Sequence, residues 1–125
     1  MFVTSFPEYA RNIQSAIDNL LATGEALLID LQIDARSTLQ GFIAGALQLE
    51  DGAELHFREF IDVRRSDPRL MYAYHYQDAN KDLVFRYDNA RHRPALPQAE
   101  HRHTLSGIEP SHAPTFQEVL DEILA

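Results

Sequence analysis

Residues 70–88, with the sequence LMYAYHYQDANKDLVFRYD, are the most informative segment for predicting the fold. Two runs rich in aromatic and apolar residues flank a mainly polar segment around Ala79 and Asn80, which is the pattern of an antiparallel hairpin. With a two-residue loop, Tyr74 lies opposite Phe85 and side chains alternate between two faces. The sequence therefore predicts one aromatic face, which we interpret as core rather than as a base-stacking platform, made by residues 72, 74, 76, 83, 85 and 87.

Before this hairpin, apolar residues at helical spacing predict a helix from Pro7 to Leu21, with Gly24 at its C-terminal cap. Residues 90–114 contain four prolines and no clear period, and they indicate a loop. A Thr-x-x-Glu capping box at Thr115 opens a final helix. Strands are expected at residues 26–34, 39–49, 54–63, 70–78 and 82–88. The expected fold is a single α+β domain over residues 1–125, with an antiparallel sheet of about five strands flanked by an N-terminal and a C-terminal helix.

Composition narrows the class of protein. The chain has 125 residues, 45% of them hydrophobic and 24% charged, as in ordinary globular domains. The absence of cysteine excludes disulfides, thiolate metal sites and a cysteine nucleophile. No apolar run is long enough to cross a membrane, and the N-terminus lacks the pattern of a secretory signal. We therefore expect a cytoplasmic protein without membrane association.

Charge is distributed unevenly along the chain. The net charge of -8 argues against a nonspecific DNA-coating protein. Residues 58–102, however, hold nine of the eleven Lys/Arg and only seven of the nineteen Asp/Glu. This distribution is typical of a surface that meets an anion on one side and a basic partner on the other. A mixed, solvated surface is the alternative.

Glu59 is the first candidate for a catalytic residue. Alternation in the strand from residue 54 places it in an otherwise apolar row with residues 55, 57, 61 and 63. A buried carboxylate needs a cationic partner, a set of hydrogen bonds or a raised pKa. The alternative is a bulged strand with a solvated Glu59.

The other candidate catalytic residues come from the mixed face of the hairpin. His75 and Arg86 are diagonal neighbours in the predicted register, and Asp88 shares their face. If Glu59 points to the same side, the sheet carries a base, an acid and a phosphate-binding cation. These groups suit phosphodiester cleavage without a metal. The alternative is structural: Arg86 pairs with Glu59 or Asp88, and His75 fills a half-exposed position.

The segment after the hairpin is rich in histidine and arginine. It predicts a contact surface for nucleic acid, another anion or a protein partner, formed by Arg91, His92, Arg93, His101, Arg102 and His103. His101 and His103, with His92 or His112, form an alternative metal-binding set, although no acidic residue beyond Glu100 lies close by in the sequence. A solvated loop is the third interpretation, and we assign no metal or cofactor.

With these residues identified, the chain resembles the TumE family of small toxin components of type II toxin–antitoxin systems. The resemblance rests on Tyr74 to Asp78, on Phe85 to Ala90 followed by His92, and on His101 to His103. It extends to the C-terminal helix. Positions that match are His75, Arg86, Asp88, Asn89, His92, His101 and His103. Arg91 and Arg93 depart from it, since a proline and a second histidine are expected around His92, and the pI of about 5.1 is low for an RNA-cleaving toxin.

The resemblance implies a toxin that is neutralised by a cognate antitoxin, usually a small helix-turn-helix protein, and a ribonuclease-like activity. It carries no settled catalytic set. Three hypotheses follow. The first is a metal-independent endoribonuclease in which His75 is the acid or base, Glu59 its counterpart and Arg86 the residue that binds the phosphate. The second is a noncatalytic protein- or nucleic-acid-binding module acting through the His/Arg-rich loop, and the third is a metal-dependent enzyme. The oligomeric state is left open.

Overall fold

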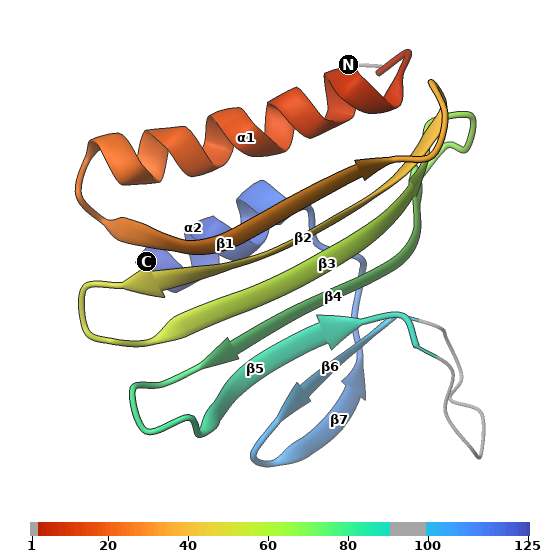
Figure 1. The fold of residues 1–125 in the computed structure, drawn as a ribbon. Coiled ribbons are helices and arrows are strands. Elements are labelled where there is room, and N and C mark those ends of the chain that lie inside the picture. Colours follow the sequence, from red (N-terminus) through yellow and green to blue (C-terminus); the bar gives the residue numbers. More distant parts are fainter. Residues whose placement is uncertain (1–2, 91–99) are drawn as a thin grey trace.

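The structure is a computed structural model that describes residues 3–90 and 100–125. It contains one antiparallel sheet in which neighbouring strands follow the order of the chain, from β1 at one edge to β7 at the other (Figure 1). The elements are α1 (Phe6–Ala22), β1 (Ala26–Ala35), β2 (Gln40–Leu49), β3 (Glu54–Asp62), β4 (Arg69–Gln77), β5 (Leu83–Asp88), β6 (His101–Thr104), β7 (Gly107–Pro110) and α2 (Phe116–Leu124). The predicted α+β class with a helix at each end is confirmed.

The sheet of the described residues has seven strands rather than about five. The two additional strands, β6 and β7, form a hairpin inside the segment that the sequence indicated as loop. Each is only four residues long, and every residue of β7 is exposed, so no alternation of apolar and polar residues reveals it. The prediction of a loop is wrong for residues 101–110.

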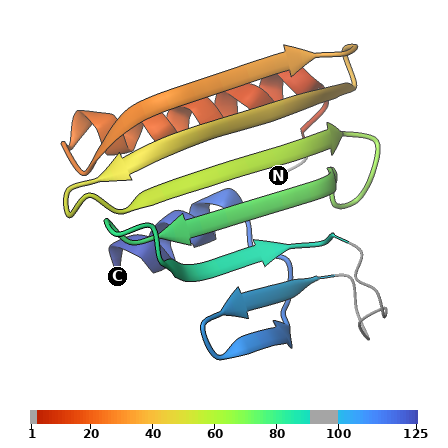
Figure 2. The same ribbon diagram turned by 60° about the horizontal axis from the view of Figure 1, so that its bottom comes forward.

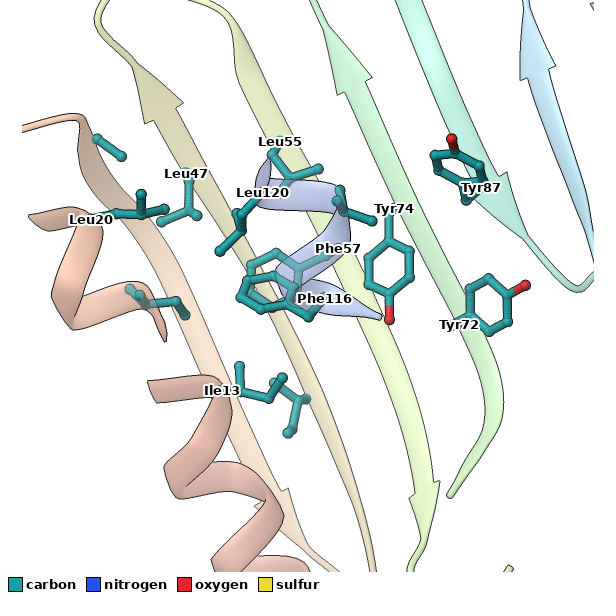
Figure 3. Close-up of a cluster of buried hydrophobic side chains, with 14 of the residues drawn as sticks. Ile13, Leu20, Leu47, Leu55, Phe57, Tyr72, Tyr74, Tyr87, Phe116 and Leu120 are labelled. Atoms are coloured by element: carbon teal, nitrogen blue, oxygen red, sulfur yellow. The ribbon is translucent and has the colours of Figure 1, made fainter. Parts of the chain in front are cut away.

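Both helices pack on the same face of the sheet, which we call the covered face (Figure 2). The core lies between them and the sheet, and Figure 3 shows Phe116 of α2 beside Phe57 of β3. Tyr72 and Tyr74 are buried in this core, which confirms the interpretation of the aromatic row. Gly41 is required here, because a side chain would collide with the ring of Phe6.

Local signals set the helix ends where the sequence predicts them. Ser5 caps α1 by accepting a hydrogen bond from the backbone N–H of Glu8, and Gly24 beyond the helix has a φ of +77°. Thr115 and Glu118 form the predicted capping box of α2. Among the described residues, neither helix is long and apolar enough to span a membrane.

The central hairpin is correct in its faces and shifted in its register. The prediction placed Tyr74 opposite Phe85, whereas the structure pairs Tyr74 with Tyr87. The turn is longer than two residues, because the carboxylate of Asp78 accepts from the backbone N–H groups of Asn80 and Asp82. A shift of two residues keeps residues 73–76 and 85–88 on their predicted faces and brings His75 directly opposite Arg86. An irregularity between Tyr76 and Gln77 changes the register beyond them and pairs Leu83 with Gln77.

Candidate functional site

The face of the sheet opposite the helices, which we call the open face, carries a row of basic side chains. The pairing of strands β3 to β6 sets His56, His75, Arg86 and His103 directly opposite one another. Directly opposed residues in an antiparallel sheet have Cβ atoms about 4.5–5.5 Å apart. Four strands thus place three imidazoles and a guanidinium in one line across the sheet.

Small residues make a hollow beside this row. Ala44, Ala46 and Ala73 occupy neighbouring open-face positions on β2 and β4, and their short side chains leave a hollow of about 460 Å³. The ionisable residues that line it are Asp30, His56, Arg58, His75 and Arg86. The hollow therefore has an alanine floor and mainly basic walls.

His75 lies half-buried in the wall of this hollow. Its Nδ1 is 3.5 Å from Nη1 of Arg86, the residue opposite on β5. Burial, and next the positive charge of Arg86, lower the pKa of His75 below its ordinary value of 6.5. The imidazole is consequently neutral at neutral pH and can accept a proton.

Asp88 fixes the position of Arg86. It is 4% exposed, and its Oδ2 accepts a hydrogen bond of 2.8 Å from Nε of Arg86. Its Oδ1 lies 2.5 Å from Nε2 of His101, and His103 is 3.4 Å away. Burial alone would raise the pKa of Asp88. Hydrogen bonds from Arg86 and from the Ala90 backbone act in the opposite direction, and the net pKa is below 3.8. Asp88 is therefore an ionised anchor.

The same cluster contains a possible set of metal ligands. Ligating atoms of Asp88, His101 and His103 all lie within 4.8 Å of one another. Two imidazoles and a carboxylate are donors that zinc and related ions accept. Arg86 binds Oδ2 of this carboxylate, while Oδ1 accepts from the backbone N–H of Ala90 and faces Nε2 of His101. Both oxygens are thus engaged, and a cation would have to bind beside the guanidinium of Arg86. We therefore interpret the cluster as an ion-pair network around Arg86.

Glu59 does not belong to this site. The condition for its proposed catalytic role, a face shared with His75 and Arg86, is not met, because Glu59 pairs with Tyr72 and points to the covered face. It is 1% exposed and accepts hydrogen bonds from the hydroxyls of Tyr9, at 2.5 Å, and Tyr74. Burial raises its pKa despite these bonds. The predicted hydrogen bonds and raised pKa are confirmed, and the alternative of a solvated Glu59 is wrong.

A second hollow, of about 490 Å³, lies on the covered face between α1, the β3–β4 connection and the start of α2. In its lining, Arg69 binds the carboxylate of Asp67 and also the hydroxyl of Tyr74. Glu59 lies behind Tyr9. This arrangement explains why Glu59 can be buried, and we assign it to stability rather than to chemistry.

The predicted contact surface is divided by the structure. Arg91, His92 and Arg93 lie outside the described residues. Arg102 lies on the covered side, where Nη2 is 3.0 Å from the carboxylate of Glu122. His101 and His103 lie on the other side, against Asp88. These three neighbouring residues of β6 therefore do not act as one surface.

The structural alternative for the hairpin is met in both of its parts, because Arg86 pairs with Asp88 and His75 is half-buried. Three ionisable residues of the hollow, Asp30, His56 and Arg58, were missed by sequence reasoning. His56 and Arg58 alternate with Leu55, Phe57 and Glu59 on β3, and that alternation was the available signal. What was lacking was the register of β3 against β4, which puts His56 opposite His75.

Comparison with known proteins shows the family to which the chain belongs. The fold and the open-face row define a small α+β protein with an exposed, histidine- and arginine-bearing sheet. A family model described as Toxin TumE matches residues 17–125, so the chain belongs to the TumE toxin family. The resemblance seen in the sequence is confirmed. Neither the curated proteins nor the solved structures gave a match.

Proposed function

We propose that this chain is the toxin component of a type II toxin–antitoxin system and acts in the cytoplasm as a metal-independent endoribonuclease. The observation that carries the proposal is the direct opposition of His56, His75 and Arg86 in a solvent-facing hollow. Membership of a toxin family supports a role of this kind. Two imidazoles and a guanidinium suffice for phosphodiester cleavage that uses the RNA's own 2′-hydroxyl as nucleophile.

In the proposed reaction, neutral His75 takes the proton of the 2′-hydroxyl while the O2′–P bond forms. The P–O5′ bond breaks, and the leaving O5′ takes a proton from a protonated His56. The products are a 2′,3′-cyclic phosphate and a 5′-hydroxyl, so atoms and charge balance without a cofactor. Arg86 binds the phosphate oxygens, where negative charge develops.

Asp88 and Arg58 have supporting roles in this proposal. Asp88 orients Arg86 by accepting from its Nε, which leaves the Nη atoms of Arg86 to face His75 and a phosphate. Arg58 lines the other side of the hollow and contacts a neighbouring phosphate. Because Glu59 lies on the covered face, His56 takes the role of the counterpart of His75 in this proposal.

The test uses the purified full-length chain with a single-stranded RNA in the presence of EDTA. We expect cleavage that leaves cyclic phosphate ends, and its loss in His75→Ala and Arg86→Ala. Matched controls are His112→Ala and Arg11→Ala, because both side chains are exposed and neither lines the hollow. Cleavage that persists in both hollow variants, or that requires a metal, would exclude the mechanism.

A second candidate function is a noncatalytic module that docks an antitoxin, and strand β1 favours it. β1 is a ten-residue edge strand, whereas the opposite edge, β7, has four residues and ends at Pro110. Leu27, Ile29 and Ile33 on β1 are 67%, 51% and 44% exposed. Long apolar edges are sites of strand addition.

Two carboxylates on this edge strand, Asp30 and Asp34, indicate the chemistry of the partner. Pairing of two copies through β1 would bring like charges together, so we infer an extended, basic segment of an antitoxin of the helix-turn-helix class. The test is co-purification with the protein encoded beside this chain. Ile29→Lys should abolish the complex and Ile108→Lys on β7, at 50% exposure, should not. Equal binding by both variants would exclude this edge.

A further inference from the structure

Two phenylalanines lie on the open face next to the basic hollow. Phe42 of β2 and Phe60 of β3 are paired in register, and their ring centroids are 6.0 Å apart at an interplanar angle of 59°. Both side chains are half-buried. Their strand neighbours Ile43, Glu59 and Ile61 point the other way and are buried under the helices. The pair is therefore presented by the sheet on the face that the helices leave open.

The hydrophobic core does not account for this pair. The core cluster contains the buried side chains of the covered face, and the half-buried hydrophobic residues packed against it come from other positions. Phe42 and Phe60 belong to neither group. They contact each other's rings beside Met71, the open-face residue opposite Phe60 on β4. Two large aromatic side chains placed outside the core are candidates for a binding surface.

The pair lies in line with the cations of the hollow. Alternation along β3 places Phe60, Arg58 and His56 on one face in consecutive steps of about 7 Å. His56 begins the row that continues to His75 and Arg86. Aromatic rings followed at regular steps by cationic groups match a chain that alternates flat bases with phosphates.

We propose that Phe42 and Phe60 form a base-stacking subsite for single-stranded RNA, with the adjoining phosphate on Arg58 and the scissile phosphate at His75 and Arg86. This inference rests on the proposed ribonuclease function and adds its substrate class. A stacking ring needs an unpaired base with a free face, which a duplex does not offer. A carboxylate lies at the margin, since Asp34 is opposite Phe42 on β1, and Arg36 neutralises it at 3.3 Å.

The chain itself provides a sensitive test, because it contains no tryptophan. Phe60→Trp creates a protein with a single indole at the proposed subsite. The probe is a single-stranded 2′-O-methyl oligonucleotide, which binds but cannot be cleaved because its 2′-oxygen is blocked. We expect saturable quenching of the indole fluorescence. The matched control is Leu105→Trp, 83% exposed between β6 and β7, which should show no saturable quenching.

Affinity separates stacking from apolar packing. Phe42→Leu and Phe60→Leu keep an apolar side chain and remove the ring, whereas Phe60→Trp keeps a ring. We expect each leucine variant to bind the single strand about 5- to 150-fold more weakly, with Phe60→Trp at least as tight as the wild type. Circular dichroism and thermal unfolding confirm that each variant is folded. A duplex of the same sequence should not quench the indole.

The outcomes distinguish this inference from the ribonuclease proposal. Cleavage with no quenching, and with unaltered affinity in the leucine variants, would overturn the subsite and leave the ribonuclease standing. Saturable quenching without cleavage of any RNA would retain the subsite and remove the ribonuclease. Equal quenching by the duplex would overturn the single-strand assignment. Quenching by a DNA single strand would also support the subsite, because base faces are common to both sugars.

Discussion

The two faces of the sheet each bury a carboxylate, and the molecule treats the two in opposite ways. Glu59 on the covered face and Asp88 on the open face are 1% and 4% exposed. Glu59 accepts hydrogen bonds from neutral tyrosine hydroxyls, and burial raises its pKa. Asp88 is bound by Arg86 and contacts His101, and its net pKa is lowered. Partners as well as burial decide in which direction the pKa of a buried acid moves, and of these two acids only Asp88 binds a cation of the open face.

The largest effect that we predict from this difference is on the rate of RNA cleavage. Arg86→Ala removes the phosphate-binding cation, and we expect RNA cleavage to fall by about 10²- to 10³-fold. Glu59→Gln leaves the open face unchanged, and we expect cleavage within about 3-fold of the wild type. The measurement is the initial rate of RNA cleavage at saturating protein. A loss with Glu59→Gln as large as that with Arg86→Ala would place chemistry on the covered face instead.

A second prediction concerns the stability that Asp88 provides. Because its folded pKa lies below its ordinary value of 3.8, the carboxylate stabilises the fold above that pH, and this stability is lost as pH falls through the folded pKa. We expect Asp88→Asn to lower the free energy of unfolding by roughly 1–3 kcal/mol at pH 7. The difference from the wild type should shrink below about pH 4. Urea unfolding of both proteins at pH 7 and pH 3.5 measures it.

Glu59 should respond to pH in the opposite direction. Its folded pKa is raised above 4.5, so the folded state keeps a proton that the unfolded state has released. The wild type therefore loses stability as pH rises from about 4.5 towards the folded pKa. The amide introduced by Glu59→Gln does not titrate, so this variant should gain on the wild type by about 1 kcal/mol per pH unit across that window. Parallel unfolding curves at every pH would contradict the raised pKa.

The fold was largely accessible from the sequence because its strands carry clear alternation. The first helix and β1 to β5 lie within two residues of their predicted bounds, and these segments combine apolar periodicity with strong turn signals. β6 and β7 were not accessible. They are short and lie between prolines, and β7 has no buried side. Pairing with β5 forms β6, and that is a tertiary effect.

About half of the candidate site could be predicted from the sequence. The rest depended on the register between strands. His75, Arg86 and Asp88 were grouped correctly because a register shift of two residues preserves the faces of a hairpin. The side of Glu59 depended on how β3 pairs with β4 across the connection at residues 63–68. That pairing contains an irregularity between Phe60 and Ile61, which the sequence does not indicate. A slip of one residue moves a side chain to the other face, so alternation within β3 placed Glu59 in its apolar row but left its side relative to His75 undecided.

The smallest predicted effect concerns His75 on the open face. Burial is the main cause of its lowered pKa, and the positive charge of Arg86 is the next. Arg86→Gln removes the positive charge and keeps a polar, although shorter, side chain. We expect the pKa of His75 to lie below 6.5 in the wild type and to rise in the variant, since the protonated ring no longer meets a cation. NMR titration of the imidazole Cε1 proton measures both values, with the exposed His112 as internal reference. An unchanged His75 pKa in Arg86→Gln would mean that burial alone sets it, and that Arg86 does not govern the proton acceptor of the open face.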